Sequence, residues 1–497
     1  MARTAILIGQ PALCALLERQ LDLLDEPPHC VGWIVTTARD ADIIAEIASP
    51  ASPVLGTLED LEAVISRARP DLALLALPGV MGDLIAAVRT RLRKLGVTDR
   101  YMPPLEDQLD GTGPRTHIDI DLADLVGRAP RDIDEAAVRR VIHNETVLIT
   151  GAGGSIGGEL ARICARFGPA RLLLMDRSEN ALFEIDRQIA RHHPHLPRKA
   201  LLHDVVDAAG TARLLCDLRP AAIFHAAAHK HVPMMEDHPG AAVDNNLFGT
   251  KSVADAADAA GAERFVMVST DKAVNPSSIM GATKRLAELY VQAINHRSGT
   301  AFSIVRFGNV LGSSGSVLEI WARQIADGGP VTVTDPRMTR YFMTISEAAS
   351  LVIQSAALVD PASPCGEVYL LDMGAPVNIL RLARRFVRQH GLEARLIEEN
   401  EYEASAGEIP IVMTGARPGE KLHESLAFDA ESMRPTMHHD INIWELAPPD
   451  DRYVEEALAR LAPENRPTDP GRLSLLIRNL VPEMVSSVAS ARIAGED

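Results

Sequence analysis

The stretch Thr146–Gly157, which reads Thr-Val-Leu-Ile-Thr-Gly-Ala-Gly-Gly-Ser-Ile-Gly, decides the fold of this chain. An apolar, β-branched run ends at Thr150, glycines stand at Gly151, Gly154 and Gly157, and a helical run follows. This order predicts a strand, a tight turn and a helix. The glycines let backbone N–H groups approach a pyrophosphate at the helix N-terminus, where the helix dipole favours negative charge. The stretch therefore predicts a dinucleotide-binding α/β fold; the alternative is a glycine-rich turn without a ligand.

The second strand of this fold supports the dinucleotide interpretation. The predicted strand 171–175 is apolar from Leu172 to Met175 and ends at Asp176, where a carboxylate is placed to bind the hydroxyl groups of an adenosine ribose. Asp176 favours NAD over NADP because a carboxylate repels a 2′-phosphate. Arg177 beside it weakens that argument and leaves NADP open.

The composition narrows the class of protein. A length of 497 residues indicates several domains. A net charge of −17 argues against nucleic acid as the main partner. The five cysteines form no Cys-x-x-Cys pair, so we expect free thiols in a reducing compartment and no metal site. No apolar run approaches the roughly 18 residues that span a bilayer, and the N-terminal apolar stretch is too short for a signal peptide. We therefore expect a cytoplasmic protein without a membrane span.

Alternating strands and helices predict the fold class as α/β, with two Rossmann-like doubly wound parallel-sheet domains. The expected order is an N-terminal non-catalytic domain, a connector, a second domain with a smaller substrate-binding cap, and a C-terminal helical tail, at residues 1–104, 105–144, 145–450 and 451–497. Predicted strands are 5–9, 31–35, 53–56, 72–77, 117–125, 146–150, 171–175, 199–203, 221–225, 264–269 and 302–306. Predicted helices are 12–21, 40–48, 58–67, 81–95, 133–142, 159–167, 180–191, 207–219, 240–260, 280–296, 453–461 and 473–479. Strands 331–334 and 368–372 and helices 345–358 and 379–390 are expected to interleave with the second sheet and form the cap.

The first turn of the N-terminal domain lacks the later glycines of the second domain. It reads Gly9-Gln-Pro-Ala-Leu-Cys14, and Pro11 also removes an N–H donor. We therefore favour a structural or regulatory role for this domain over a second dinucleotide site.

Residues that can carry chemistry follow the predicted strand 264–269. Thr270, Asp271 and Lys272 come next, and Met280 and Lys284 are spaced to share one face of the following helix. In the short-chain dehydrogenase/reductase pattern that face carries Tyr-x-x-x-Lys. Methionine in place of the tyrosine cannot exchange a proton. The alternative for the Thr-Asp-Lys triplet is a solvated polar turn.

Six segments together resemble the extended short-chain dehydrogenase/reductases of polysaccharide biosynthesis, and more narrowly the capsular-polysaccharide type of UDP-N-acetylglucosamine 4,6-dehydratase. They are Thr150-Gly-Ala-Gly-Gly-Ser-Ile-Gly157, His225-Ala-Ala-Ala-His-Lys-His-Val-Pro233, Ser269-Thr-Asp-Lys-Ala-Val-Asn-Pro276, Met280-Gly-Ala-Thr-Lys-Arg285, Arg306-Phe-Gly-Asn-Val-Leu-Gly312 and Arg417-Pro-Gly-Glu-Lys421. The resemblance covers residue 117 to the C-terminus. Methionine at the tyrosine position is characteristic of that subfamily. Its long members carry transmembrane helices before a similar N-terminal domain, and we expect none here.

The resemblance implies a lyase that dehydrates UDP-N-acetylglucosamine to the 4-keto-6-deoxy sugar nucleotide by internal hydride transfer through bound NAD. Hydride leaves carbon 4, a base removes the hydrogen at carbon 5, an acid protonates the departing carbon 6 hydroxyl, and the hydride returns to carbon 6. By resemblance Asp271 is the acid and Lys272 the base. Thr270 bonds the carbon 4 oxygen, Lys284 binds the nicotinamide ribose, and Met280 takes the tyrosine position.

The remaining site residues are expected at strand ends and in the resembling loops. The cofactor-binding residues are Gly151, Gly154, Ser155, Ile156, Gly157, Asp176, Arg177, Asp204, Ala226, Ala227 and Lys284. The substrate-binding residues are His229, Lys230, Asn309, Arg340, Arg417 and Glu420, since an acidic protein needs local cations to hold a sugar diphosphate. The alternatives are a helix N-cap for Asp204 and a surface turn for residues 417–420. Asn246 is expected to be structural.

Two other functions remain open at this point. A related sugar-nucleotide epimerase or reductase would be expected to keep tyrosine at position 280, and an inactive NAD-binding scaffold would not need the Thr-Asp-Lys triplet. We expect a homo-oligomer whose partner is the UDP-sugar substrate.

Overall fold

The computed structural model describes residues 4–21, 27–37, 52–78, 81–102, 133–359, 367–390, 392–397, 408–427, 433–446, 449–481 and 483–484. The predicted helix 40–48 and edge strand 117–125 lie outside these residues. The chain divides into two compact units, one of residues 1–121, 321–332 and 383–412 and one of residues 122–320, 333–382 and 413–497. No helix among the described residues is long and apolar enough to cross a membrane.

The N-terminal sheet has five strands in the order β3-β2-β1-β4-β5, and its strand pairs are parallel. Its elements are β1 (Thr4–Gly9), α1 (Pro11–Leu21), β2 (His29–Val35), β3 (Val54–Thr57), η1 (Leu58–Asp60), α3 (Leu61–Ala68), β4 (Leu72–Ala76), α4 (Gly82–Lys94) and β5 (Thr98–Tyr101). The unpredicted strand β5 reads Thr-Asp-Arg-Tyr and lies at the sheet edge, where half-exposed residues give no apolar pattern.

The second sheet has nine strands in the order β20-β21-β16-β11-β10-β9-β6-β7-β8. Its pairs are parallel except at β21 and β20, which add antiparallel strands at one edge. Its strands are β6 (Thr146–Thr150), β7 (Arg171–Asp176), β8 (Arg198–Leu202), β9 (Ala222–His225), β10 (Arg264–Val268), β11 (Ala301–Arg306), β16 (Glu367–Leu371), β20 (Met433–Pro435) and β21 (Ile441–Trp444). The order reverses between β6 and β9, and such a switch point opens a crevice at the carboxyl ends of the strands.

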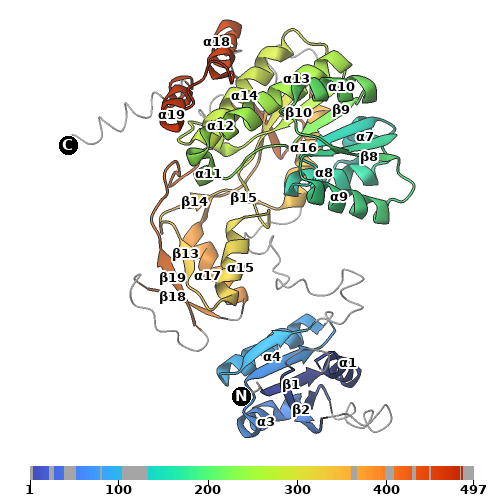
Figure 1. Cartoon of the computed structure of the whole chain (residues 1–497), viewed down its shortest axis with the longest axis vertical. Coiled ribbons are helices and arrows are strands. Elements are labelled where there is room, and N and C mark those ends of the chain that lie inside the picture. Colours follow the sequence, from blue (N-terminus) through green and yellow to red (C-terminus); the bar gives the residue numbers. More distant parts are fainter. Residues whose placement is uncertain are drawn as a thin grey trace, which may run out of the picture. The chain divides into compact units, whose positions relative to one another are not determined.

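Helices cover both faces of this sheet (Figure 1). One face is packed by α7 (Glu135–Ile142), α8 (Ser155–Arg166), α9 (Glu179–His192) and α16 (Ile345–Leu358), and the other by α10 (Ala208–Leu218), α13 (Gly249–Ala260) and α14 (Ile279–Asn295). The sequence prediction placed helix 345–358 in the cap. In the structure α16 packs against the second sheet together with α7 and α8. This position buries its mostly apolar residues on nearly every side of the helix.

The predicted helix 240–260 is divided in three. It consists of α12 (Pro239–Ala242), a π-helical turn η3 (Val243–Phe248) and α13, and an unpredicted short helix α11 (Val232–Asp237) precedes it. A π-helical turn keeps the apolar pattern roughly helical, so a sequence pattern does not separate it from an α-helix. The turn places Asn245 and Asn246 near the switch point.

Residues beyond 306 supply smaller elements. They form a three-stranded sheet in the order β13-β19-β18 and two-stranded pairs β12–β15 and β14–β17. Their bounds are β12 (Asn309–Val310), α15 (Val317–Ala326), β13 (Val331–Val333), β14 (Thr339–Arg340), β15 (Phe342–Met343), β17 (Val377–Asn378), α17 (Ile379–Gln389), β18 (Glu393–Leu396) and β19 (Glu408–Met413). Strand β16, which the sequence also assigned to interleaving segments, pairs in parallel with β11.

The two C-terminal helices α18 (Asp451–Leu461) and α19 (Pro470–Asn479) join the main core. Leu461, Leu473 and Ile477 are buried in the same apolar cluster as the residues of α14. Helix α14 is consequently buried along almost its whole length, between the sheet and these helices. The described part of the tail is thus packed against the core of the second sheet.

Candidate active site

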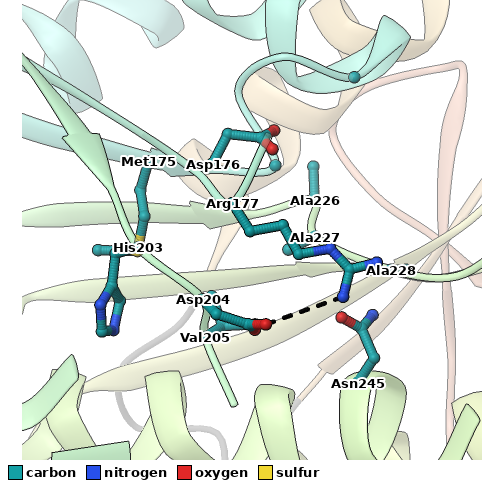
Figure 2. Close-up of a pocket in the computed structure, with 12 residues that line it drawn as sticks. Met175, Asp176, Arg177, His203, Asp204, Val205, Ala226, Ala227, Ala228 and Asn245 are labelled. Carbon is teal, nitrogen blue, oxygen red and sulfur yellow. Dashed lines mark ion pairs between the residues drawn. The ribbon is translucent and has the colours of Figure 1, made fainter. Parts of the chain in front are cut away.

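A cavity of about 150 Å³ lies at the switch point (Figure 2). It is lined by Gly151, Gly154, Met175, Asp176, Arg177, His203, Asp204, Val205, Ala226, Ala227, Ala228 and Asn245. Gly151 has a φ of +66°, and a Cβ there would lie 2.7 Å from the Ala227 nitrogen. The glycine turn and the loop after β9 therefore meet through bare backbone, which leaves the cavity between them.

The carboxylate of Asp176 is fixed at the end of β7. Its Oδ2 accepts a hydrogen bond from Gly153 N at 2.9 Å, and its Oδ1 accepts one from Ser178 N at 2.8 Å. Arg177 extends along the cavity, with Nη1 3.9 Å from Asp204 Oδ2 and Nη2 3.1 Å from His229 Nε2. Figure 2 marks the Arg177–Asp204 ion pair across the cavity. A carboxylate and a guanidinium thus lie side by side where a ribose is expected.

The structure places seven of the eleven predicted cofactor residues on this cavity, which we call the cofactor cavity after that prediction. Of the four exceptions, three lie at the start of α8 and the fourth, Lys284, lies in α14. Gly151, Gly154, Asp176, Arg177, Asp204, Ala226 and Ala227 line the cavity, whereas Ser155, Ile156 and Gly157 begin α8 beside it. Met175, His203, Val205 and Asn245 also line the cavity and were missed. His203 and Val205 flank Asp204 in sequence, so the strand end itself was the available signal, and the π-helical turn that carries Asn245 gave none.

Two predicted residues hold the loop after β12. Ser314 N donates to Ser155 Oγ at 3.0 Å, and Lys230 Nζ donates to Ser314 O at 2.6 Å and to Ser313 Oγ at 3.4 Å. Burial lowers the pKa of Lys230. These side chains therefore position loop residues 313–314 beside the glycine turn.

His229 and Asn246 form a second link near the cofactor cavity. His229 N donates to Asn246 Oδ1 at 2.8 Å, and Asn246 Nδ2 donates back to His229 O and to Thr283 Oγ1. Asn246 is fully buried and ties the loop after β9 to α14, which agrees with the structural role expected for it. His229, predicted to bind substrate, lies on the cofactor side through its contact with Arg177.

Thr270, Asp271 and Lys272 form one hydrogen-bonded group after β10. Asp271 Oδ1 accepts from Thr270 Oγ1 and from Lys272 Nζ, each at 2.9 Å, and Lys272 Nζ also donates to Asn309 Oδ1 at 3.0 Å. Asp271 is fully buried, and its Oδ2 has no hydrogen-bond partner in the part of the chain that the structure describes. A buried carboxyl with one bare oxygen beside an amine is an arrangement suited to proton transfer.

Lys272 opens onto a second cavity of about 130 Å³. This cavity is lined by Val232, Lys272, Ser277, Ser278, Asn309, Arg340, Gly419, Glu420, Lys421 and Glu424. Asn309, Arg340 and Glu420 were predicted to bind substrate and are brought together with Lys272 here. The predicted Arg417 is absent from this lining.

The two arginines predicted to hold substrate have partners within the protein. Arg340 donates through Nη1 to Thr339 O and through Nη2 to Lys421 O, at 2.7 and 2.8 Å. Exposed Arg417 pairs with Glu420, with Nη2 2.6 Å from Oε1. In this structure Arg340 binds the backbone carbonyls of residues 421 and 422, and Arg417 is paired with the Glu420 carboxylate that was predicted to bind substrate.

Lys421 and Glu424 were missed by sequence reasoning. Lys421 Nζ donates to Val274 O at 2.8 Å and lies 3.6 Å from Glu424 Oε2, while burial lowers the pKa of Lys421. Lys421 belongs to the quoted segment that begins at Arg417, and Glu424 follows it at helical spacing. The signal was present, but charged residues at that spacing also describe an ordinary surface pair.

Met280 and Lys284 are buried in α14, as their shared helix face predicts. Lys284 Nζ donates to Val268 O at 2.8 Å. Burial lowers the pKa of Lys284 to about 8, although the negative charge of Glu288 acts to raise it. Glu288 is itself buried and accepts from Arg306 Nε at 2.7 Å. Lys284 lines neither cavity, so its contact with a cofactor stays a prediction.

A buried histidine ends strand β9, beside the end of β6 that leads into the glycine turn. His225 Nδ1 lies 2.8 Å from Thr150 Oγ1, and Nε2 lies 3.0 Å from Thr250 Oγ1. Burial, with a smaller contribution from Lys284, lowers the pKa of His225 to about 3. The ring is therefore neutral in the folded protein at physiological pH.

His225 is expected to make stability sensitive to acid. Its folded pKa is below the unfolded value of about 6.5, so the unfolded chain gains a proton first as the pH falls. From pH 7 to pH 5 the wild type is expected to lose about 2 kcal/mol of unfolding free energy relative to His225→Gln. Urea unfolding of both proteins at the two pH values measures this; parallel pH profiles would contradict it.

Among the described residues, one group of potential metal ligands gathers within 4.8 Å: His438, His439 and Asp440. His439 is exposed, and none of the three lines either cavity. His439 Nε2 lies 3.0 Å from Asp440 Oδ2, which is an ordinary histidine–carboxylate contact.

Comparison with known proteins assigns the family. A model of the family described as "Polysaccharide biosynthesis protein" matches residues 147–445. The "Probable polysaccharide biosynthesis protein EpsC" of Bacillus subtilis (strain 168) is 39% identical over 440 residues, which cover 87% of this chain and 70% of that protein. The "Capsular polysaccharide biosynthesis protein CapD" of Staphylococcus aureus is 42% identical over 376 residues, 75% of this chain and 60% of that protein.

More distant relatives include nucleotide-sugar enzymes of two kinds. A UDP-N-acetylglucosamine 4,6-dehydratase (inverting) of Campylobacter jejuni is 28% identical over 59% of this chain and 80% of its own. A UDP-glucose 4-epimerase of Rickettsia rickettsii is 30% identical over 58% of this chain and 79% of its own. The crystal structure of Pen from Bacillus thuringiensis superposes with a TM-score of 0.54 at 29% identity, over 61% of this chain and 89% of its own.

These matches confirm the α/β fold class and the resemblance at the level of the family. They span the glycine turn, the Thr-Asp-Lys triplet and the residues of both cavities up to Glu424. The chain belongs to the polysaccharide biosynthesis protein family, of the extended short-chain dehydrogenase/reductase type.

Proposed function

We propose that the protein is a nucleotide-sugar 4,6-dehydratase that converts UDP-N-acetylglucosamine to its 4-keto-6-deoxy form with NAD as a resident cofactor. The observation that carries the proposal is the buried Asp271 joined to Lys272, which opens onto a cavity while methionine stands at position 280. An acid and a base side by side, without a tyrosine, suit elimination better than epimerisation.

The cofactor cavity supports the choice of a dinucleotide. A Cβ at Gly157 would lie 2.0 Å from Gly151 O, so the close-packed turn tolerates only glycine there. Asp176 lies at the expected ribose position and favours NAD, while Arg177 keeps NADP as the alternative. Hydride chemistry, from carbon 4 of the sugar and back to carbon 6, is what the nicotinamide ring would supply when bound.

Lys272 at the second cavity and its hydrogen-bonded neighbours Thr270 and Asp271 would then take defined roles. As hydride leaves carbon 4, Asp271 would take up the proton of the carbon 4 hydroxyl, and it would then give a proton to the departing carbon 6 hydroxyl. Lys272 would remove the proton from carbon 5 and return one to carbon 5 when hydride reaches carbon 6. The Thr270 hydroxyl, already hydrogen-bonded to Asp271, would bond the carbon 4 oxygen. The buried surroundings of Asp271 exclude water, which protects the intermediate from side reactions.

A direct assay tests the proposal. Purified protein is incubated with UDP-N-acetylglucosamine without added reductant, and the product is analysed by mass. Loss of one water is the expected result. An unchanged mass with inverted stereochemistry would assign an epimerase instead, and bound NAD without turnover would assign a scaffold.

Gly157→Ala is expected to abolish cofactor binding, lowering affinity by about 100-fold or more, because the new methyl group collides with the Gly151 carbonyl. Gly158→Ala is the matched control: a Cβ there meets Ala152 O at 3.4 Å, an ordinary contact. Fluorescence titration with NADH measures both affinities. Equal affinities in the two variants would contradict the assigned cradle.

A further inference from the structure

Helix α19 contacts α14, the helix that carries Met280 and Lys284, and it also forms an ion pair with α11. Arg478 of α19 forms an ion pair with Glu236 of α11, with Nη2 3.2 Å from Oε2. The Glu236 side chain is 16% exposed and the Arg478 side chain 38%. The Glu236 carboxylate is therefore mostly buried, while the Arg478 side chain is partly exposed to solvent.

The other oxygen of Glu236 binds the start of α14. Glu236 Oε1 accepts a hydrogen bond from Ile279 N at 2.6 Å, and Ile279 is the first residue of that helix. An anion there satisfies an N–H without an intrahelical partner and complements the helix dipole. Because Met280 follows directly, Glu236 fixes the position of the helix end that faces the active site.

The same carboxylate packs behind Gly419, one of the residues that line the second cavity. A Cβ at Gly419 would lie 3.0 Å from Glu236 Oε1, and Gly419 has a φ of +81°, so its backbone passes against the carboxylate. Ser277 Oγ donates to Gly419 O at 2.9 Å. Ser277, Ser278 and Gly419 all line the cavity onto which Lys272 opens.

The tail does not depend on Arg478 for its attachment. Arg466 binds Asp244 through both terminal nitrogens, at 2.5 and 2.8 Å, and Arg285 Nε lies 2.9 Å from Glu483 Oε1. Leu473 and Ile477 are buried in the shared core. Loss of the Arg478 guanidinium alone should leave α19 docked, so its effect on the cavity can be measured separately.

We propose that Glu236 is a positioning residue of the substrate cavity and that α19 completes the site by holding its carboxylate through Arg478. Only the identity of the ligand rests on the function proposed above. Without Arg478, the carboxylate is free to leave Ile279 N and Gly419, and the wall formed by residues 277–278 and 419 loses its support.

The expected result is a selective loss of substrate affinity. Arg478→Ala should raise KM about tenfold and change kcat less than about threefold, since the reacting groups stay in place. NADH affinity should stay at the wild-type value. Arg478→Lys should restore most of the affinity, and Arg472→Ala, an exposed arginine on the same helix, should match the wild type.

Hydrogen exchange read by mass spectrometry tests the coupling without relying on activity. In Arg478→Ala and Glu236→Gln, peptides covering 277–285 and 417–422 should exchange about tenfold faster than in wild type and Arg472→Ala, while peptides of β6 and β7 stay unchanged. Wild-type exchange in those two peptides would overturn the proposal, as would faster exchange with an unchanged KM. If the wild type does not dehydrate UDP-N-acetylglucosamine, the proposed function fails, and the exchange result still decides the role of Glu236.

Discussion

Lys272→Ala is expected to lower product formation by about a thousandfold while the cofactor remains bound, because general-base catalysis is lost. The Lys272 side-chain nitrogen joins Asp271 Oδ1 to Asn309 Oδ1 at the edge of the second cavity. Its removal leaves proton abstraction from carbon 5 without a base. The cofactor cavity does not include Lys272. Single-turnover assays with product analysis by mass, and dinucleotide content after denaturation, measure the two quantities.

The matched control for this variant is Lys199→Ala, an exposed lysine on β8. It should retain full turnover. Turnover above one tenth of the wild-type rate in Lys272→Ala would remove Lys272 from the mechanism, whatever the cofactor content.

Asp271→Asn is expected to lower turnover by about 10²- to 10⁴-fold with little change in melting temperature. Asparagine keeps the shape of the buried side chain, and its Oδ1 can still accept from Thr270 and Lys272. An amide cannot deliver a proton to a leaving hydroxyl. The variant therefore separates the proton-donating role of Asp271 from its role in the hydrogen-bonded group.

Two measurements accompany this variant. UDP affinity by calorimetry should remain near the wild-type value, and the control Asp217→Asn on the exposed face of α10 should be fully active. A variant with normal turnover would show that Asp271 serves only to hold its neighbours.

The core of the fold and the cofactor cavity were predictable because they depend on short segments. The glycines at 151, 154 and 157 and the acid at 176 each follow an apolar strand, and parallel strands end at the same edge of a sheet. The Thr270–Lys272 triplet follows the same rule. Strand ends therefore placed these residues without any knowledge of distant contacts.

The roles of the predicted substrate-binding arginines depend on which partner each side chain contacts in the folded protein. Arg340 and Arg417 were predicted to meet a diphosphate, but Arg340 binds backbone carbonyls near residue 421 and Arg417 binds Glu420. Sequence spacing gives the charge of an arginine and not its competing partners. Helix 345–358 was assigned to the cap for a related reason, since a mostly apolar helix fits under a cap or against a sheet equally well.

The C-terminal tail illustrates the limit most clearly. Both of its helices were predicted from apolar spacing and turn residues. Its connections to the site, Arg466–Asp244 and Arg478–Glu236, join residues more than 200 positions apart. No local pattern indicates such pairs, so the tail looked like a separate appendage in the sequence.

The central claim is that hydride leaves carbon 4 and returns to carbon 6 of the same sugar within one active site. The most direct test uses UDP-N-acetylglucosamine carrying deuterium at carbon 4, with the wild-type protein, its own bound cofactor and no added reductant. We expect a product that has lost one water and carries the deuterium on its carbon 6 methyl group. A product of unchanged mass, or a dehydrated product without deuterium on carbon 6, would contradict it.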